Sequence, residues 1–203
     1  MLLDWDGVLH HWNGAGERAG EQAEGLPAGA IAATAFGTQD YEYAKLGILT
    51  DAQWRASVAT ILAERFGGRG ATAVAVWAAE RGRVIGGAAD LLALLRRHYK
   101  VGLLSDNTDI LPGDLALFGL AGSFDHVFVS AHLGMTKPAP ALYRHAARAM
   151  HIAPQRVLVI DDLAVNLPGA AAVGMHVHHL AASLPQFVHE YLVQEETCPK
   201  SCG

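Results

Sequence analysis

The second half of the chain alternates short apolar runs with segments that carry apolar residues at helical spacing. The apolar runs predict strands at 99–105, 126–131, 156–162 and 175–180. The first and the third of them end in polar residues, as buried parallel strands do. Helices are predicted at 138–150 and at 164–173, and Gly174 ends the second helix. This alternation favours a parallel sheet with right-handed crossover connections.

The first half, from about residue 13 to residue 90, contains no convincing strand pattern. Its opening segment, 13–25, is rich in glycine and charge, which is typical of a mobile connection. One helical pattern has an N-cap in Thr50 or Asp51 and ends at Gly67. The predicted helices cover 28–36, 50–67, 71–82 and 87–98. We therefore expect a helical insertion near the start of an α/β core.

The expected architecture is a Rossmann-like α/β core with a parallel sheet and an inserted α-helical cap. We assign residues 1–12 and 91–193 to the core, 13–90 to the cap insertion and 194–203 to a flexible tail. Both cysteines of the chain lie in that tail. A frayed terminus with reduced thiols is a simpler interpretation of this pair than a redox or metal role.

Composition excludes several classes of partner. The chain has 203 residues, of which 51% are apolar and 17% charged, as in a globular protein with a substantial core. The net charge is −5 and no basic stripe gathers the Lys and Arg residues, so we expect no nucleic-acid partner. No apolar run approaches the length of a membrane span, and Asp4 and Asp6 argue against a signal peptide. We expect a cytoplasmic protein, as a monomer or a homodimer.

The chain opens with MLLDWDGVLHHW, in which two aspartates follow a very short apolar stub. We interpret the stub as the central strand, with Asp4 at its tip and Gly7 allowing the turn toward the cap. Only three residues precede Asp4, whereas a strand usually has about five. Either the neighbouring strands hold this short one tightly, or the natural chain begins upstream, which is the interpretation that we favour.

Four polar clusters follow the ends of predicted strands. They are Asp4 with Asp6, the segment SDNT at 105–108, Lys137, and Asp161 with Asp162. Each cluster alone is weak evidence for a functional site, since a carboxylate after a strand is most often a helix N-cap. Because the carboxyl ends of parallel strands form one ligand crevice, we expect these side chains to converge.

The joint chemistry of these clusters is specific. Converging carboxylates repel one another unless a cation neutralises them, and hard oxygen ligands select Mg²⁺. A Ser hydroxyl and a Lys ammonium supply the donor and the positive charge that a transferring phosphoryl group requires. One aspartate can act as the nucleophile, and a second, two residues further on, can exchange a proton with the leaving group and water.

These residues, in this order, resemble the four motifs of the haloacid dehalogenase superfamily. The resemblance covers essentially the whole chain and extends to GMTKPAPALY at 134–143 and VIDDLAVNLPGAAAVGM at 159–175. It is closest to the small-phosphatase branch, whose helical cap lies between the first and second motifs, as residues 13–90 do here. The resemblance implies an α/β core, a helical cap and Mg²⁺ as the cofactor.

The resemblance also implies roles for single residues. Asp4 would be the nucleophile and a metal ligand. Asp6 would be the general acid/base and would bind the metal through its backbone carbonyl. Ser105 would bind a phosphoryl oxygen, and Lys137 would neutralise both the nucleophile and the phosphate.

The fourth motif and the departures from the family complete the expected site. Asp162 is the expected direct metal ligand, Asp161 would act through water, and Asn166 would orient their loop. We also place Asp106 and Asn107 in the phosphate-binding segment. The family commonly has Asn directly after the Ser, so the acid at 106 departs from the pattern. An acid beside phosphate is unfavourable unless it points away or is protonated.

We therefore predict Mg²⁺-dependent hydrolysis of a small phosphate monoester through an aspartyl-phosphate, with a small phosphorylated metabolite as the partner. Haloacid dehalogenases generally lack an Asp at the position of Asp6, so its presence favours phosphoryl chemistry, in which the leaving group needs a proton. Two alternatives stay open: a sugar-phosphate mutase or phosphotransferase, and a catalytically weak member that binds a phosphorylated ligand. A receiver domain of two-component signalling is disfavoured, because its Lys comes last along the chain.

The histidines and tryptophans allow further interpretations. Alternation puts His176 and His178 on one strand face, which zinc could use, but partly exposed polar residues are the simpler interpretation. Three residues follow the proposed nucleophile closely: His10, His11 and Trp12. They either face the substrate or pack at the cap hinge, and the sequence does not decide between these. Trp54 and Trp77 lie at helical spacing from apolar neighbours and are expected in the cap core.

Overall fold

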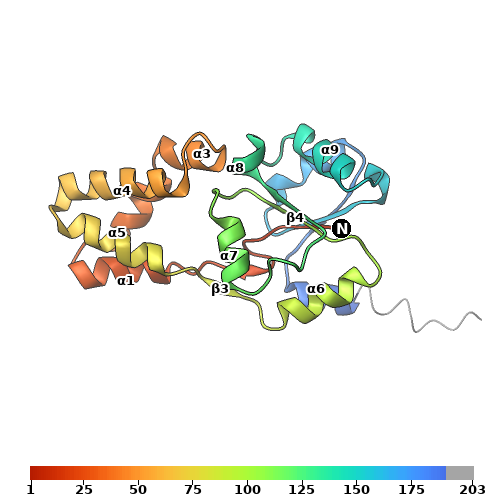
Figure 1. Ribbon diagram of the computed structural model, residues 1–203, viewed down its shortest axis with the longest axis horizontal. Coiled ribbons are helices and arrows are strands. Elements are labelled where there is room, and N and C mark those ends of the chain that lie inside the picture. The colour runs from red at the N-terminus through yellow and green to blue at the C-terminus, as the bar shows by residue number, and fades with distance from the viewer. Residues whose placement is uncertain (191–203) are drawn as a thin grey trace, which may run out of the picture.

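The computed structural model describes residues 1–190 and shows an α/β core beside a helical cap (Figure 1). The chain passes from the core into the cap after residue 12 and returns before residue 88. The predicted tail at 194–203, with Cys198 and Cys202, lies outside the described residues. Within residues 1–190, no helix is long and apolar enough to cross a membrane.

The core is built on a five-stranded parallel sheet in the order β5-β4-β1-β6-β7. In chain order the strands are β1 (Leu2–Leu3), β4 (Gly102–Ser105), β5 (His126–Val129), β6 (Leu158–Asp161) and β7 (His176–His179). The two-residue strand β1 is central, as predicted, because β4 pairs with one of its edges and β6 with the other. Leu2 and Leu3 are fully buried on opposite faces, so neighbours on every side hold this short strand.

Helices cover both faces of the sheet. On the face that buries Leu3 lie α6 (Ala88–Arg96), α7 (Leu111–Leu117) and α11 (Leu184–Val188). On the face that buries Leu2 lie α9 (Pro140–Ala149) and α10 (Pro168–Ala172). The connections carry α8 (Ser130–Leu133) and the 3₁₀ turns η1 (Pro154–Arg156) and η2 (Ala164–Asn166). The segment predicted as one helix at 164–173 is therefore split into η2 and α10.

The cap contains five helices within the described residues. They are α1 (Ala15–Glu24), α2 (Ala30–Phe36), α3 (Gln39–Lys45), α4 (Asp51–Phe66) and α5 (Arg69–Ala79). Thr50, one of the two predicted N-caps, starts α4 with a capping box. Trp54 and Trp77 are buried in the cap core, which confirms their predicted place. Their rings meet edge to face with centroids 5.4 Å apart.

The prediction of a mobile connection at 13–25 is wrong, because this segment forms helix α1 against α5. Two of its glycines, Gly16 and Gly20, serve close helix packing. A Cβ atom at Gly20 would lie 2.3 Å from the carbonyl oxygen of Ala73, and one at Gly16 would lie 3.0 Å from that of Trp77. Larger residues would push the two helices apart, so the glycine content that suggested a loop reflects a tight helix contact.

A small antiparallel pair of strands joins the cap to the core. Strand β2 (His10–His11) pairs with β3 (Arg83–Val84), a strand that the sequence pattern did not predict. Two residues are too short to show the alternation by which strands are recognised. Helix α6 then packs in the core, so the final residues of the segment assigned to the cap form the return connection and the start of a core helix.

Candidate active site

Asp4 lies directly beyond β1, at the carboxyl edge of the sheet. Its backbone N–H donates to the carbonyl oxygen of Ile160 at 3.0 Å, so the strand pairing continues up to the functional side chain. Its Oδ1 accepts a hydrogen bond of 2.7 Å from the backbone N–H of Trp5, which leaves Oδ2 facing Lys137. The short strand thus fixes both the position and the orientation of a buried carboxylate.

Lys137 bridges two carboxylates. Its Nζ lies 2.8 Å from Oδ2 of Asp4 and donates to Oδ2 of Asp161 at 2.7 Å, and all three side chains are buried. Burial raises the pKa of Asp4 to about 7, although the Lys137 ammonium opposes that shift. Burial alone would lower the pKa of Lys137, but the two carboxylates outweigh it and raise that pKa above its ordinary value. Lys137 is therefore a fixed positive charge beside Asp4.

Asp161 and Asp162, at the end of β6, differ in their hydrogen bonds. Both side-chain oxygens of Asp161 have protein partners, whereas one oxygen of Asp162 has none within residues 1–190. Oδ1 of Asp161 accepts hydrogen bonds of 2.9 Å from the N–H of Leu163 and from the side-chain amide of Asn166. By contrast, Oδ1 of Asp162 is buried and has no hydrogen-bond partner among the described residues. Burial, followed by the charge of Asp161, raises the pKa of Asp162. A buried carboxylate oxygen without a hydrogen-bond partner is free to act as a cation ligand.

Carboxylate oxygens of Asp4, Asp161 and Asp162 lie within 4.8 Å of one another. An all-oxygen set of this kind suits a hard divalent cation such as Mg²⁺. Gly7 lies against the set: a Cβ atom there would come within 2.0 Å of Asp162, and the residue has a φ of 79°. Glycine at this turn therefore leaves room for the acidic side chain and permits the positive φ.

Asp6 is held by His10, a contact that the sequence did not reveal. Nδ1 of His10 lies 2.6 Å from Oδ1 of Asp6, and Nε2 lies 2.8 Å from the carbonyl oxygen of Arg81. Because that carbonyl only accepts hydrogen bonds, Nε2 carries a proton. The contact with Asp6 then contains a further proton, held either by the imidazole or by the carboxyl group. Burial would lower the pKa of His10, but its bonds to Asp6 and Arg81 raise it overall.

The segment after β4 supplies polar groups on the other side of Asp4. Ser105 is buried at the end of β4. Both carboxylate oxygens of Asp106 accept from the backbone N–H of Lys137, at 3.0 and 3.1 Å, and burial raises the pKa of Asp106. The side-chain amide of Asn107 donates to Asp6 at 3.5 Å. Asp106 therefore ties its own loop to the Lys137 loop.

These side chains meet in one cavity of about 500 Å³, which we call the catalytic pocket. The predicted site residues that line it are Asp4, Asp6, Ser105, Asp106, Lys137, Asp162 and Asn166. Asn107 lines a neighbouring cavity instead, and Asp161 stands behind Lys137. Together the residues can hold a divalent cation and a phosphoryl group next to a buried carboxylate.

Two cap residues complete the catalytic pocket: Tyr41 and Lys45, both on α3. Neither residue was predicted, because the sequence pattern indicated no helix there. Their spacing of four residues places both on one face of a helix, which is a pattern that could have identified them. Lys45 lies 4.9 Å from the centre of the Tyr41 ring and pairs with Glu42 at 2.8 Å. The cap thus contributes an ammonium group to the lining of the pocket.

The late histidines do not form a metal site within residues 1–190, where the cluster of possible ligands is the aspartate trio. His176 is exposed and contacts the carbonyl oxygen of Gln155 at 3.0 Å. His178 packs its ring against Phe187. His179 differs from them because it contacts the acidic pair: its Nε2 donates to the carbonyl oxygen of Asp162 at 2.9 Å. The simpler interpretation of His176 and His178 fits these contacts.

Comparison with known proteins identifies the same family that the four motifs resemble. The family model described as haloacid dehalogenase-like hydrolase matches residues 1–174. The chain is 31% identical over 87 residues to the glyceraldehyde 3-phosphate phosphatase of Pyrococcus furiosus, a match that covers 42% of this chain and 36% of that protein. It is 33% identical over 96 residues to human haloacid dehalogenase-like hydrolase domain-containing protein 3, and this match covers 46% of this chain and 38% of that protein. The matches thus span less than two-fifths of the length of these curated relatives.

A solved structure matches over nearly the whole length of both chains. It is a HAD family enzyme from Bacteroides thetaiotaomicron in complex with magnesium and inorganic phosphate, with a TM-score of 0.73 and 21% sequence identity. The match covers 92% of this chain and 96% of that chain. At this identity the likeness shows the fold, and it confirms the predicted α/β fold class.

Proposed function

The chain belongs to the haloacid dehalogenase-like hydrolases, and we propose that it hydrolyses a small phosphate monoester in a Mg²⁺-dependent reaction through an aspartyl-phosphate. The observation that carries this proposal is the buried Lys137 ammonium between Asp4 and Asp161, beside the unpaired oxygen of Asp162. This arrangement joins a nucleophilic carboxylate to the positive charge that phosphoryl transfer needs.

The reaction divides into two displacements at phosphorus. In the first, a carboxylate oxygen of Asp4 attacks phosphorus, the bond to the ester oxygen breaks, and Asp6 gives its proton to the leaving oxygen. In the second, Asp6 takes a proton from water as the water oxygen attacks phosphorus, and Asp4 is released together with phosphate. Lys137 and Ser105 contact the phosphoryl oxygens, and His10 keeps Asp6 in place for both proton transfers.

Mg²⁺ would be held by Asp4, Asp162 and the backbone carbonyl of Asp6, with Asp161 acting through water. When bound, it supplies positive charge that offsets the charge of the phosphoryl oxygens and the carboxylates. The unpaired Oδ1 of Asp162 supports this assignment over the reverse order of the pair, because both oxygens of Asp161 already have protein partners.

Two observations support turnover over mere ligand binding or dehalogenation. Asp106, whose acid departs from the family pattern, turns its carboxylate to the backbone of Lys137, where it supports the site. Asp6 is paired with His10 at 2.6 Å, and an acid held in this way suits a reaction whose leaving group needs a proton. The substrate class, a small phosphorylated metabolite, is in keeping with the name of the Pyrococcus furiosus relative. We also propose a cytoplasmic location.

The experiment is an assay of the purified chain on 4-nitrophenyl phosphate and a panel of sugar, triose and nucleotide phosphates, with Mg²⁺ and with EDTA. 2-Chloropropionate serves as the substrate for carbon–halogen cleavage. We expect phosphate release that requires Mg²⁺ and no release of chloride. Absence of phosphate release from every ester, or chloride release alone, would refute the proposal.

A further inference from the structure

A second cavity of about 270 Å³ lies beside the catalytic pocket, between the core and the cap. Six aromatic side chains line it: Trp5, Trp12, Phe36, Tyr41, Trp54 and Trp77. We call it the aromatic chamber. Asp6, Trp12 and Tyr41 line both cavities, so the chamber and the catalytic pocket share a wall.

Asp6 lies in that shared wall, and its position determines which part of a substrate can enter the chamber. In the proposed reaction Asp6 protonates the leaving oxygen, so that oxygen must lie within hydrogen-bond reach of its carboxyl group. Phosphorus lies on the Asp4 side of Asp6, and the group that departs with the oxygen extends away from it. We propose, on the basis of the function proposed above, that the aromatic chamber binds the leaving group, and that this group is a flat apolar moiety with a neutral hydrogen-bond acceptor.

The shape of the chamber favours a flat group. The Trp54 ring meets Tyr41 at 5.0 Å and Phe36 at 5.9 Å between centroids, so these rings form part of a continuous apolar wall. Phe36 is 44% exposed, although it is a large apolar residue next to a cavity. A cavity of about 150 Å³ already takes benzene, so 270 Å³ admits one substituted ring. Aromatic walls also favour flat partners through offset stacking.

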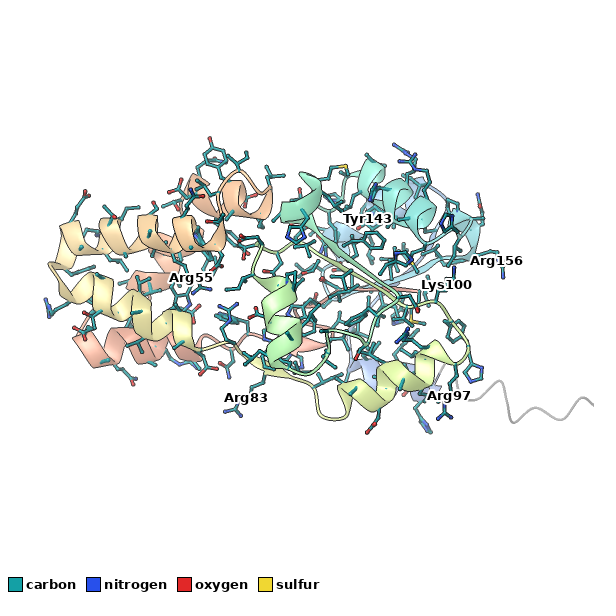
Figure 2. All side chains as sticks on the ribbon, viewed as in Figure 1. Arg55, Arg83, Arg97, Lys100, Tyr143 and Arg156 are labelled. Carbon is teal, nitrogen blue, oxygen red and sulfur yellow. The ribbon has the colours of Figure 1, made fainter. Side chains whose placement is uncertain are left out.

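Arg55 supplies the polar contact. It lies inside the cap between α4 and α5 (Figure 2), with its guanidinium carbon 4.6 Å from the centre of the Trp77 ring. Its Nε donates to Asp51 at 2.6 Å, whereas its Nη1 is buried without a hydrogen-bond partner among the described residues. A buried donor without an acceptor is costly. An acceptor on a ligand in the chamber would satisfy it.

The charges around Arg55 indicate a neutral acceptor. Both oxygens of Asp51 are in use, since one accepts from Arg55 and the other accepts from the Thr108 hydroxyl at 2.9 Å. Asp114 is paired with Arg81, whose Nε donates to it at 2.9 Å. The guanidinium of Arg55 is thus already neutralised by Asp51. A carbonyl or hydroxyl oxygen completes its bonding without adding an uncompensated charge to a buried site.

The test compares two aryl phosphates of nearly equal shape. 4-Acetylphenyl phosphate carries a carbonyl acceptor, and 4-isopropylphenyl phosphate carries none. Values of kcat/KM with Mg²⁺ are measured for the wild-type chain, for Arg55→Met and for Arg65→Met, a control at an exposed position of the same helix. The intrinsic reactivity of the esters cancels when their ratio is compared between proteins. We expect Arg55→Met to lower the acetyl-to-isopropyl ratio roughly tenfold or more, and Arg65→Met to leave it unchanged.

Arg55→Lys provides a second variant, because it keeps a positive charge for Asp51 and lacks the fork of the guanidinium. Circular dichroism identifies the variant that folds, and the same fall in ratio is expected from it. A third ester, 4-carboxyphenyl phosphate, tests the charge of the acceptor. An unchanged acetyl-to-isopropyl ratio in a folded Arg55 variant overturns the inference. A preference for the carboxylate ester that disappears in that variant overturns the neutral acceptor.

A binding measurement separates this inference from the proposed function. Titration calorimetry with 4-hydroxyacetophenone, the alcohol released from the acetyl ester, needs no turnover. We expect it to bind the wild-type chain and Arg65→Met equally, and Arg55→Met or Arg55→Lys roughly tenfold more weakly. Binding of this kind without hydrolysis of any ester would refute the phosphatase and leave the chamber assignment standing. Hydrolysis with no difference in binding or in ratio would refute the chamber assignment alone.

Discussion

The two cavities that meet at Asp6 differ in composition. The catalytic pocket is lined by aspartates from the ends of core strands around one buried lysine, Lys137. The aromatic chamber has six aromatic side chains in its lining, most of them from the cap, and Arg55 and Arg81 in it are paired with aspartates. The pocket can therefore stabilise charge on a phosphoryl group, whereas the chamber can select the shape of what is attached to it.

Because the two cavities depend on different parts of the fold, substitutions can alter one cavity and leave the other intact. The sheet holds Asp4 through backbone hydrogen bonds on both sides of β1, so the chemistry depends on the core fold. The chamber depends on packing among cap helices α2, α4 and α5, which can vary while the sheet stays the same. Variants in the two cavities should accordingly affect kcat and substrate preference separately.

The largest expected effect is that of Asp4→Asn on the catalytic pocket. The amide is a poor nucleophile, so kcat on 4-nitrophenyl phosphate should fall by roughly 10⁴-fold or more. The melting curve should keep its cooperative shape, since the amide has the same size. Asp90→Asn, at an exposed position on α6, is the control and should retain full activity. Ordinary turnover by Asp4→Asn would contradict the assignment of the nucleophile.

Lys137→Met should affect both the activity and the stability of the core. Removing the ammonium leaves Asp4 and Asp161 buried side by side without their shared counter-charge. We expect kcat to fall roughly 10³-fold and the free energy of unfolding in EDTA to fall by about 3 kcal/mol. Activity assays and urea denaturation measure the two effects. A variant as stable as the wild-type chain would show that Lys137 does not neutralise these carboxylates.

His10→Gln tests the wall that the two cavities share. Glutamine can still contact Asp6, but it cannot hold the second proton that the imidazole shares with the carboxyl group. We expect kcat to fall about 10- to 100-fold with little change in KM, and the pH profile of kcat to change. His98→Gln, at an exposed position that lines neither cavity, is the control. Equal effects of the two variants would remove the proposed role of His10.

Metal binding should change the pH dependence of stability. The pKa of Asp4 is raised by burial from 3.8 to about 7, so the metal-free folded state retains a proton that the unfolded state loses. The free energy of unfolding in EDTA should therefore fall as the pH rises through this interval. Mg²⁺ needs the ionised carboxylate, so it should stabilise the protein by about 1 kcal/mol more at pH 8 than at pH 5. Thermal melts with and without Mg²⁺ at both pH values check this, and equal stabilisation would contradict it.

The smallest effect is expected in the chamber, for Phe36→Ala. The ring is only partly buried, so its loss should change stability little. It should raise KM for 4-nitrophenyl phosphate about three- to tenfold and leave kcat unchanged, because an apolar wall of the chamber is lost. KM for a phosphate without a ring, such as glycerol 3-phosphate, should not change. A parallel rise for both substrates would place Phe36 outside the leaving-group site.

The strand ends were predictable because their pattern is local. Each apolar run stops at a polar residue, and parallel strands put Asp4, Ser105 and Asp161 at one edge of the sheet. The order of the strands made the stub MLL central, which its length alone did not suggest. The family resemblance already predicted that Asp162 would bind the metal directly and that Asp161 would act through water, and the unpaired oxygen of Asp162 supports that division of roles.

The cap was less predictable, for a physical reason. Glycines at 16 and 20 favour a loop by propensity, but helix α5 packs so closely on α1 that only glycine fits there. The contact of His10 with Asp6 results from a turn that local pattern does not encode, although the two residues are only four apart. The aromatic chamber gathers rings from positions 5 to 77, and such long-range packing leaves no periodic trace in the sequence.

The most direct test is to find the phosphoryl group on the protein. The wild-type chain is mixed with Mg²⁺ and 4-nitrophenyl phosphate, quenched in acid within one turnover, digested and analysed by mass spectrometry, with Asp4→Asn treated in parallel. We predict that the peptide containing Asp4 gains the mass of HPO₃, a phosphoryl group in place of a hydrogen, in the wild-type chain and gains none in the variant. A phosphoryl group on His10, on His11 or on any peptide outside this segment, or the same gain in Asp4→Asn, would contradict an aspartyl-phosphate at Asp4.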